Sequence, residues 1–511
     1  NINQSDNITI IFTFVFISLV SFACVFRLIV LYILTRFSFS LGVDIGYKIY
    51  KHTLYQPFLV HVNRNSSVLI NAIVTQTETV VFSVIISFLT LCNSMIMLLG
   101  VGIVLCVVNL KLTIIAITFF IILYSLIMLV TKKQLRQSGK NVAEKGSELI
   151  KALQEGFGGI RDIIVDGSQL AHLRIFNETN KILKKSMGNI QIISGSPRFI
   201  IEALGMIAIA CAALIASQSP NGILDSLPII GTLALGAQRL LPVLQEAFRN
   251  LSVIKGTEAS LVDVLNFLDQ EMPNHQNVLQ VKEIIFNNSI TLKNIQFGYS
   301  KLENDVFKNL NYSFLKGKRI GIIGETGAGK STFTDILMGL LEPDKGSIYI
   351  DKIKLNNINL RSWQKQIAHV PQNIFLTDGT IYQNIAFGVE EDEIDDERLK
   401  NAAKNAQLDK FVRTLSYGYK TNIGETGIRL SGGQKQRIGI ARALYKKAKI
   451  IIFDEATNSL DGETEKLIMD TIYRLNKDLT LIIIAHRLST LSQCDEIIEI
   501  KNNKIIKTYE K

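Results

Sequence analysis

The sequence predicts a two-part fold in which a bundle of membrane-spanning α-helices is followed by an α/β domain. Hydrophobic residues make up 48% of the 511 residues and the mean hydropathy is +0.25, which is too apolar for an ordinary soluble enzyme. Long apolar runs fill residues 1–275, whereas residues 288–511 alternate short β-branched stretches with amphipathic helical ones. The polar stretch DQEMPNHQNVLQVKE lies between the two parts, and we expect the linker there, at residues 276–287.

Five apolar runs in the first part are each close to the ~20 residues that a helix needs to cross a bilayer. They lie at residues 8–35, 80–108, 112–130, 199–217 and 223–244. Basic residues follow the first run (Lys48, Lys51) and the third (Lys132, Lys133), which places both connections in the cytoplasm. The chain then starts outside and enters the α/β domain on the cytoplasmic side. A chain that starts outside and crosses five times lacks a first helix that starts in the cytoplasm. The sequence also lacks an initial methionine, so we expect it to be N-terminally incomplete.

The two cytoplasmic connections, residues 36–79 and 131–198, are long for loops and carry helical patterning. We expect the spanning helices to continue well into the cytoplasm, and a pair of small soluble insertions is the alternative. The net charge of +10 is compatible with nucleic-acid binding, but surplus Lys and Arg are usual in cytoplasmic loops, so no nucleic-acid partner is expected. The five cysteines show no metal-ligand spacing and predict no disulfide framework.

A glycine-rich loop carries the first chemical motif of the α/β part. The segment GKRIGIIGETGAGKSTFTDILMGLL is typical of a strand, a phosphate-binding loop and a helix. Glycines let the backbone approach an anion, Lys330 can reach the β- and γ-phosphates, and Ser331 can ligate Mg²⁺. The expected ATP-binding residues of this loop are Gly324, Glu325, Thr326, Gly327, Ala328, Gly329, Lys330, Ser331 and Thr332.

Two acidic residues end a second buried strand, KIIIFDE. Asp454 is placed to hold Mg²⁺ and Glu455 to polarise an attacking water, which together with the phosphate loop predicts ATP hydrolysis. The structural alternative is a helix N-cap beside a solvated acid.

Between these motifs lies LSGGQ, which comprises Leu430, Ser431, Gly432, Gly433 and Gln434. With this motif, residues 288–511 resemble the ATP-binding-cassette (ABC) superfamily. The resemblance implies that two cassettes sandwich two ATP molecules, and that the signature of one completes the phosphate-loop site of the other in trans. A serine hydroxyl, glycine amides and a helix N-terminus together make an anion site, which gives this role a physical basis.

Four further residues match the family's motifs in the expected order. By resemblance, Tyr299 of FGYS stacks on adenine and Asp461 ends the D-loop. Gln372 of VPQNIFL contacts Mg²⁺ and reports nucleotide state to the membrane domain, and His486 of IIIAHRLS contacts the γ-phosphate. Each of these residues alone is compatible with a purely structural role. Because their joint order and spacing match, we expect Gln372, Glu455 and His486 to form the catalytic set.

Membrane helices that precede the cassette in one chain resemble an exporter-type half-transporter, which has six spans in its complete form. The resemblance implies a domain-swapped homodimer with two active ATP sites. It also implies a multi-pass protein of the inner (plasma) membrane with its ATP-binding domain in the cytoplasm. The segment TNIGETG, with Glu425, resembles a further exporter-type motif. Coupling helices, which transmit cassette closure to the bundle, are expected near residues 56–67 and 163–173.

A resemblance to the flippase for lipid-linked oligosaccharides of bacterial N-glycosylation (PglK-type) runs through both parts. It is carried by VFRLIVLY, SPRFIIEALG, LALGAQRLLP, NIFLTDGTIYQNIAFG and IIIAHRLSTLSQCDEI. It predicts ATP-driven flipping of a polyprenyl-pyrophosphate-linked oligosaccharide. The alternatives are a lipid A or phospholipid flippase and a multidrug or peptide exporter. The five spans argue against a cassette ATPase that acts on a macromolecule, and an ATP-gated channel is a third class.

Three arginines, Arg27, Arg198 and Arg239, lie within apolar spans. They stand roughly 12–19 residues from the outer ends of their helices, or about 18–28 Å at ~1.5 Å per residue, which places them toward the inner leaflet. A charge in the bilayer core costs at least ~2.5 kcal/mol, so such a residue snorkels, pairs or lines a cavity. Snorkelling, helped for Arg198 by Glu202 one turn later, is one interpretation. The family resemblance favours the other, in which the three guanidinium groups line a cavity and bind the lipid pyrophosphate.

Overall fold

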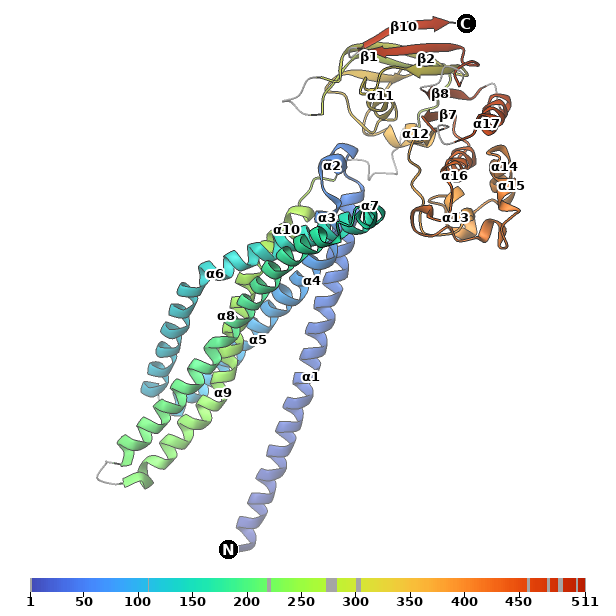
Figure 1. Ribbon diagram of the computed structural model, residues 1–511. Helices are drawn as coiled ribbons and strands as arrows, with labels where there is room; N and C mark the ends of the chain where they lie inside the picture. The colour runs from blue at the N-terminus through green and yellow to red at the C-terminus, as the bar shows by residue number, and fades with distance from the viewer. Residues whose placement is uncertain are drawn as a thin grey trace. The chain divides into compact units, whose positions relative to one another are not determined.

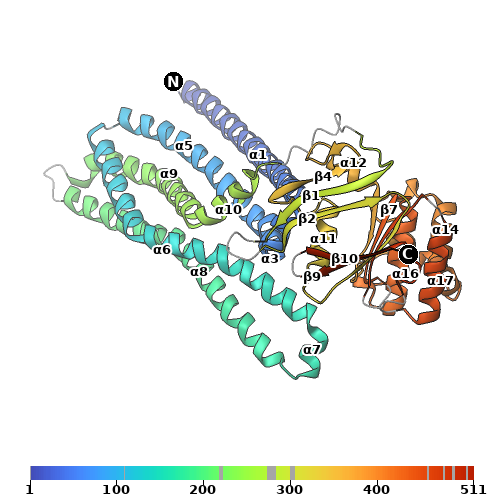
Figure 2. The same ribbon diagram turned by 90° about the horizontal axis from the view of Figure 1, so that it is seen from above.

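We describe the fold from a computed structural model of the chain. The structure describes residues 2–108, 110–217, 222–272, 283–299, 305–456, 460–475, 478–485, 490–501 and 504–510. It divides into two compact units, one of residues Asn1–Gln56 and Asn63–Glu271, the other of residues Pro57–Val62 and Met272–Lys511. The first unit is helical and the second contains the sheets (Figure 1, Figure 2).

Long helices make up the first unit. Their bounds are α1 Ile2–Leu54, α5 Ile86–Val108, α6 Leu110–Gly158, α8 Gln169–Ser217, α9 Gly222–Gly256 and α10 Glu258–Leu268. The turns that lead into α5 are α3 Ser66–Ile70, the π-helical η1 Asn71–Gln76, α4 Thr77–Thr79 and the π-helical η2 Val80–Ile85. Among the described residues, four stretches are long and apolar enough to cross a membrane, at 8–54, 66–107, 117–158 and 169–207. The fifth predicted span falls in α9, where the side chains of residues 222–237 lie outside the description.

The prediction that the spanning helices continue through the long connections is confirmed. Helix α1 has 53 residues, and α6 and α8 have 49 residues each. At ~1.5 Å per residue, 49 residues extend over about 74 Å, more than twice the ~30 Å hydrocarbon core. The alternative of small soluble insertions is therefore wrong.

Two short helices, α2 Phe58–Asn63 and α7 Ile160–Val165, lie at the turns that the sequence predicts to be cytoplasmic. Helix α2 falls inside the coupling segment predicted at 56–67. Helix α7 begins before the predicted 163–173, because α6 already ends at Gly158 and the chain turns toward α8 at Gly167, whose φ is 64°. The predicted segment at 163–173 therefore spans the end of α7 and the start of α8, and its coupling role stays a prediction.

Small residues let α6, α8 and α9 approach one another closely. A Cβ atom on Gly139 of α6 would collide with the backbone carbonyl of Gly256 at the end of α9. A Cβ atom on Gly256 would lie 2.9 Å from Ile190 Cγ2 of α8. Leu135 and Ile193 are buried around this point. Because neither glycine has room for a side chain, the three helices are held in a fixed mutual position here.

The outer half of α1 is apolar and uncovered within the described chain. Phe12 is 70% exposed and Phe22 is 71% exposed, and their aliphatic neighbours are similar. Figure 1 shows this part of α1 apart from the other helices. A helix that is apolar around its circumference is stable only with lipid or other protein around it.

The described part of the second unit contains ten strands. They are β1 Ser289–Phe297, β2 Phe307–Leu315, β3 Arg319–Ile323, β4 Lys345–Ile350, β5 Ile353–Lys354, β6 Ile367–Val370, β7 Ile450–Asp454, β8 Thr480–Ile484, β9 Glu496–Lys501 and β10 Lys504–Glu510. Its α-helices are α11 Lys330–Leu337, α12 Leu360–Lys365, α13 Ile381–Ile385, α14 Asp396–Asn405, α15 Asp409–Val412, α16 Gly432–Tyr445 and α17 Gly462–Leu475. Single-turn 3-10 helices are η5 Glu391–Glu393, η6 Gly418–Lys420 and η7 Glu425–Gly427.

The strands form two sheets. The smaller sheet is antiparallel with the order β2-β1-β4-β5, and the larger has the order β10-β9-β3-β8-β7-β6. From β9 to β6 the neighbours run parallel, and β10 is antiparallel to β9. The carboxyl ends of β3, β8, β7 and β6 therefore meet at one edge, where ligands of open parallel sheets usually bind.

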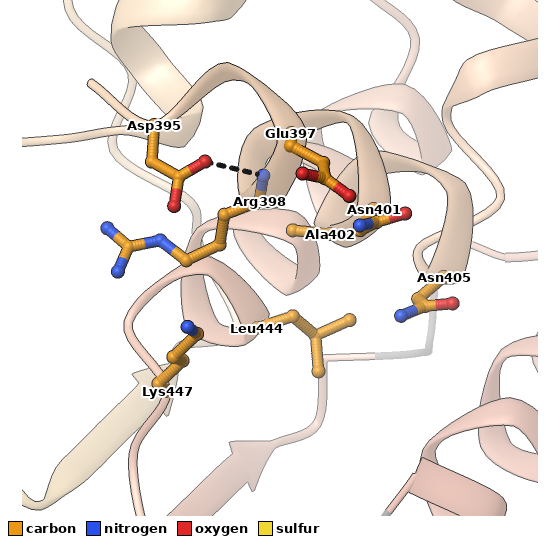
Figure 3. A pocket seen from close by; sticks show the side chains of 8 residues that line it. All are labelled: Asp395, Glu397, Arg398, Asn401, Ala402, Asn405, Leu444 and Lys447. Atoms are coloured by element: carbon orange, nitrogen blue, oxygen red, sulfur yellow. Dashed lines mark hydrogen bonds between the residues drawn. The ribbon is translucent and has the colours of Figure 1, made fainter.

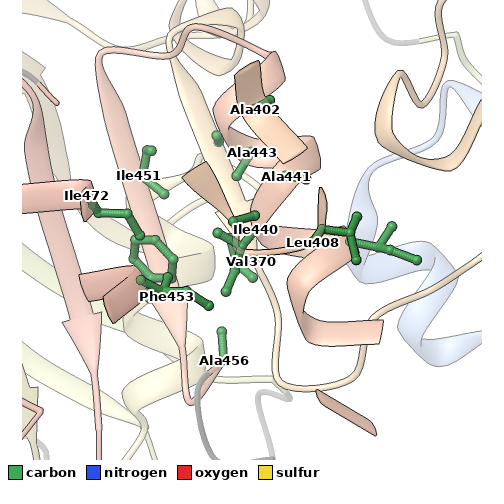
Figure 4. Close-up of a cluster of buried hydrophobic side chains, with 14 of the residues drawn as sticks. Val370, Ala402, Leu408, Ile440, Ala441, Ala443, Ile451, Phe453, Ala456 and Ile472 are labelled. Carbon is green, nitrogen blue, oxygen red and sulfur yellow. The ribbon is translucent and has the colours of Figure 1, made fainter. Parts of the chain in front are cut away.

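Apolar side chains on both faces of the larger sheet form two cores. Strand β7 contributes Ile451 and Phe453 to one core and Ile450 and Ile452 to the other, as its period of two requires. Figure 4 shows the first core, in which the strands pack against α14, α16 and α17. In the second core Trp363 is fully buried, and its indole N–H donates to the carbonyl that ends α11 at 2.9 Å.

Candidate functional site

Strands of the larger sheet deliver the predicted site residues to one edge. Strand β3 leads into the phosphate loop, β7 ends in Asp454, and Gln372 follows β6 by two residues. The register pairs Ile484 of β8 with both Ile322 of β3 and Asp454 of β7, so these three strands end level. His486 follows β8 by two residues and lies outside the described part of the chain.

The phosphate loop depends on glycine for its backbone shape. Gly327 and Gly329 adopt φ values of 83° and 93°, which are strained for other residues. Lys330 is buried at the start of α11, and its ammonium donates to the carbonyl oxygens of Gly324 at 3.0 Å and Glu325 at 3.1 Å. An ammonium has three donors, so Lys330 closes the loop and keeps a donor for an anion at the helix N-terminus.

Three carboxyl groups crowd beside this loop. Burial and the charge of Glu455 raise the pKa of Asp454, although a hydrogen bond from the Ser331 hydroxyl and the Lys330 charge oppose the rise. Burial and the charge of Asp454 also raise the pKa of Asp335 to about 6. Asp335 is not among the site residues predicted from the sequence. The signal was its i,i+4 spacing from Ser331, which puts both side chains on one face of α11.

Glu455 is held by two other segments. Its backbone N–H donates to the Ile484 carbonyl oxygen at 3.0 Å, and its carboxylate accepts a hydrogen bond from Gln372 Nε2 at 3.0 Å. Its φ of 50° lies in the left-handed region, which costs a non-glycine residue about 1–3 kcal/mol. The structure thus joins two residues that the sequence placed in separate motifs.

Tyr299 lies next to the phosphate loop. Its hydroxyl is 3.0 Å from the hydroxyl oxygen of Thr332, which is itself buried in α11. Tyr299 is 37% exposed, and its ring meets the Phe297 ring edge-on with 5.2 Å between the ring centres. Thr332 therefore anchors the ring, a role that its position in the motif did not reveal.

Ser431 begins α16 as its N-cap. Its hydroxyl oxygen accepts the Gln434 N–H at 3.3 Å, and the Gln434 side chain accepts the Ser431 N–H at 2.8 Å. This capping box was readable from the Ser-x-x-Gln spacing. No acceptor in the described chain takes the Ser431 O–H, so it remains a donor at the positive end of a 14-residue helix.

Two other predicted motif residues lie at helix starts or turns. Asp461 accepts the Thr464 N–H at 2.9 Å at the start of α17, and this bond lowers the pKa of Asp461. Glu425 is exposed and follows Gly424, whose φ is 74°. Asp461 therefore has a capping role in addition to any contact with nucleotide.

The three predicted arginines lie on three different helices. Arg27 is exposed on α1, and Arg239 lies on α9 with its side chain outside the description. Arg198 of α8 pairs with Glu202 at 2.9 Å, and Gln245 of α9 donates to the same carboxylate at 3.4 Å. Arg198 therefore has the partner that the snorkelling interpretation assigned to it.

A polar hollow of about 380 Å³ opens on the second unit between α14 and the end of α16 (Figure 3). Asp395 accepts the Arg398 backbone N–H there at 2.9 Å and caps α14, and the Arg398 guanidinium stacks 3.9 Å from the Tyr445 ring centre. None of the predicted site residues lines this hollow, so we assign it no part in the nucleotide chemistry.

Replacing Asp335 by Asn is expected to stabilise the nucleotide-free protein at pH 7 and above. The pKa of Asp335 rises from 3.8 to about 6 on folding, so its stabilising contribution is complete below pH 4 and is lost as the pH rises through 6. Asn does not titrate. For a partly exposed carboxyl we expect a gain of about 1 kcal/mol, or about 2–4 °C, that vanishes near pH 4. Trp363, the sole tryptophan, reports the thermal midpoint because it bonds the end of the same helix.

Asp351→Asn is the matched control and has the opposite sign. Burial opposes ionisation of Asp351, but backbone N–H groups of residues 287–289 and the Lys316 charge outweigh it, so the pKa of Asp351 is lowered. Ionised Asp351 therefore contributes to the free energy of unfolding above pH 4, and this contribution is lost as the pH falls further. Asp351→Asn should lower the thermal midpoint at pH 7. Equal midpoints for Asp335→Asn and the parent at every pH would contradict the carboxyl cluster.

A phosphate loop on a largely parallel sheet, in one chain with helices that can cross a membrane, defines a membrane-embedded P-loop ATPase. The family model of the ABC transporter transmembrane region matches residues 1–224, and the ABC transporter family model matches residues 307–458. The chain therefore belongs to the ABC transporters. It binds and hydrolyses ATP to drive transport, and its ATPase domain is cytoplasmic.

Curated relatives align along both units. The chain is 28% identical over 462 residues to the ATP-dependent lipid A-core flippase of Pasteurella multocida, which covers 90% of this chain and 78% of the relative. It is 29% identical over 490 residues to the ATP-dependent lipid A-core flippase of Pseudoalteromonas atlantica, covering 94% and 82%. The solved structure of a bacterial Atm1-family ABC exporter with ATP bound matches with a TM-score of 0.81 at 23% identity, over 93% of this chain and 83% of that one. This likeness confirms the predicted exporter fold.

Proposed function

We propose that the protein is an ATP-driven flippase for a phosphate-bearing lipid and works as a homodimer in the inner membrane. The observation that carries the proposal is the alignment with lipid A-core flippases, which extends over 90% or more of the chain and so includes the membrane helices. The arginines on α1, α8 and α9 add support, because guanidinium groups bind phosphate oxygens bidentately and stay charged when buried.

In the proposed hydrolysis step, Glu455 polarises the water that attacks the γ-phosphate. Gln372 orients the Glu455 carboxylate through their 3.0 Å hydrogen bond. Lys330 and the N-terminus of α11 hold the β- and γ-phosphates. Tyr299 stacks on adenine, and His486 contacts the γ-phosphate, as the family resemblance implies.

The polar residues around the carboxyl ends of β3, β6 and β7 suit a Mg²⁺ ion. Ser331, Asp454 and Gln372 supply the oxygen ligands that Mg²⁺ prefers, and a cation would relieve the crowding that raises the pKa of Asp335 and Asp454. Within the described residues, no three His, Cys, Asp or Glu side chains form a metal site by themselves. Mg²⁺ commonly completes its coordination with nucleotide phosphates and water, and when bound it neutralises charge on those phosphates.

The homodimer proposal rests on two surfaces that one chain leaves open. At the N-terminus of α16, the Ser431 hydroxyl has no acceptor among the described residues. The apolar outer half of α1 is uncovered within the described chain. A second copy would bring Ser431 and Gly433 to the opposite phosphate loop. Such an arrangement gives two equivalent ATP sites per dimer.

Mixing two inactive variants tests whether the signature acts in trans. Lys330→Ala removes the phosphate contact, and Ser431→Arg blocks the signature. In a mixed dimer one composite site carries both defects and the other carries none. We therefore expect up to about half of the mixed dimers' sites to recover ATP-dependent cassette pairing, measured by cross-linking or light scattering. Equal loss in the mixture and in both single-variant preparations would show that the two motifs act within one chain.

Two classes of lipid carry the phosphate that the proposal requires. The curated relatives favour a lipid A-type glycolipid. The polyprenyl-pyrophosphate-linked oligosaccharide stays a prediction from the sequence resemblance. Both lipids present anionic phosphate at the level of the headgroup, so the three arginines can bind either one.

Reconstitution separates these two substrates. Proteoliposomes containing the protein are loaded with fluorescent lipid A or with a fluorescent polyprenyl-pyrophosphate glycan, and label accessible at the outer face is measured with and without ATP. We expect ATP-dependent movement of at least one of the two lipids, and none with a non-hydrolysable ATP analogue. If ATP is hydrolysed but neither lipid moves while a phosphate-free drug does, the proposal is overturned.

A further inference from the structure

Five basic side chains gather in one groove of the first unit. The groove has a volume of about 800 Å³ and is lined by α6 together with the end of α9 and the start of α10. Its cationic lining residues are Lys132, Lys133, Arg136, Lys140 and Lys255. The arginines of the proposed substrate cavity are not among them.

The charge along this groove is uneven. Lys140 pairs with Glu144 at 3.5 Å, and Lys255 pairs with Glu258 at 3.6 Å. These two cations are therefore largely neutralised by acids in the groove itself. We call the part of the groove that holds Lys140, Glu144, Lys255 and Glu258 its balanced end.

The other end carries three cations that form no ion pair. Lys132, Lys133 and Arg136 are exposed, and no acid pairs with them in the described part of the chain. Asp263, the third lining acid, accepts a hydrogen bond from Gln76 Nε2 at 2.9 Å. They are the first charges after the apolar run of α6. Leu129, one turn earlier, also lines the groove and is 73% exposed. An apolar rim next to a basic surface matches the boundary between acyl chains and headgroups in the cytoplasmic leaflet.

The groove is a fixed feature of the helix packing. Next to the groove, Gly139 of α6 abuts the Gly256 carbonyl, and Leu135 of α6 is fully buried. This contact holds the basic stripe of α6 beside α10. A ligand can then bind without separating the helices.

We propose that the membrane end of this groove binds the phosphate headgroup of an anionic phospholipid of the cytoplasmic leaflet. The acyl chains lie on the apolar side at Leu129, and the phosphate lies among Lys132, Lys133 and Arg136. A lipid headgroup is favoured over free phosphate because these three cations adjoin apolar surface. The inference requires that this end of α6 is cytoplasmic, and it does not depend on which lipid is flipped.

A tryptophan at Leu129 tests this site. The intact chain carrying Leu129→Trp is placed in nanodiscs with brominated phosphatidylglycerol or brominated phosphatidylcholine, and quenching gives the relative affinity of the two lipids. Signal from the buried Trp363 is subtracted with the unsubstituted chain. We expect phosphatidylglycerol to be favoured by at least about fivefold, since each nearby cation contributes about that factor. The preference should shrink in 0.5 M salt.

Paired variants locate the site within the groove. Lys132→Gln/Arg136→Gln should lower the preference severalfold and leave only the contribution of Lys133, whereas Lys132→Arg/Arg136→Lys should keep it. Lys140→Gln/Lys255→Gln removes the same charge from the balanced end and should also keep it. The proposal is overturned if the parent shows no preference, if the balanced-end variant loses as much as the membrane-end variant, or if millimolar inorganic phosphate abolishes the preference at constant ionic strength. The last outcome would identify a soluble phosphate ligand instead.

Discussion

Glu455→Gln is expected to lower ATP hydrolysis by about 10² to 10⁴-fold while ATP still binds. General-base catalysis contributes a factor of this size, and the amide of Gln cannot accept the proton of the attacking water. The replacement keeps the size of the side chain, so Gln372 retains a hydrogen-bonding partner at this position. Phosphate release by the purified protein and binding of a fluorescent ATP analogue measure the two effects separately.

Glu397→Gln supplies the control for this prediction. Glu397 is an exposed acid of α14 that lines the polar hollow of Figure 3, away from the phosphate loop. Its replacement should leave both hydrolysis and ATP binding unchanged. Hydrolysis by Glu455→Gln within a few-fold of the parental rate would refute the general-base assignment.

Replacing Arg27, Arg198 and Arg239 together with Gln is expected to abolish lipid flipping and to leave basal ATP hydrolysis largely intact. The three replacements remove the proposed phosphate ligands of the cavity, and the cassette is untouched. A charge-assisted bidentate contact is stronger than a neutral hydrogen bond. Removing all three arginines should therefore reduce flipping far more than removing one of them. The measurement is ATP-dependent lipid movement in proteoliposomes, alongside phosphate release from the same sample.

A second triple variant controls for lost membrane anchoring. Arg36→Gln/Lys48→Gln/Lys51→Gln removes three cations from the cytoplasmic half of α1, outside the proposed cavity. It should flip lipid at close to the parental rate. If the variant of Arg27, Arg198 and Arg239 is well folded and also flips normally, these arginines are membrane anchors and the phosphate-binding proposal fails.

Local patterns in the sequence were sufficient for the class of protein and for most of the elements. Apolar runs of about 20 residues predict spanning helices because the bilayer sets their length. The Gly-x-x-x-x-Gly-Lys-Ser spacing predicts a phosphate loop because only glycine adopts the φ of 93° found at Gly329 without strain. The continuation of α6 and α8 through the long connections followed from the length of those connections and from their helical periodicity. Each of these features is decided by residues that are near one another in the chain.

Tertiary structure decided which distant residues meet. Gln372 and Glu455 are 83 residues apart, and they hydrogen-bond because β6 and β7 are neighbours in the larger sheet. Asp335 lies near Asp454 because β8 is inserted between β3 and β7, so that their ends fall at one edge. The basic groove exists because α6 lies against the α9–α10 junction at Gly139 and Gly256. Strand order and helix contacts depend on packing between segments that are far apart in the chain, and residue periodicity does not encode such packing. The sequence by itself therefore determined the helices, strands and motifs, and the tertiary packing determined which charged residues share a site.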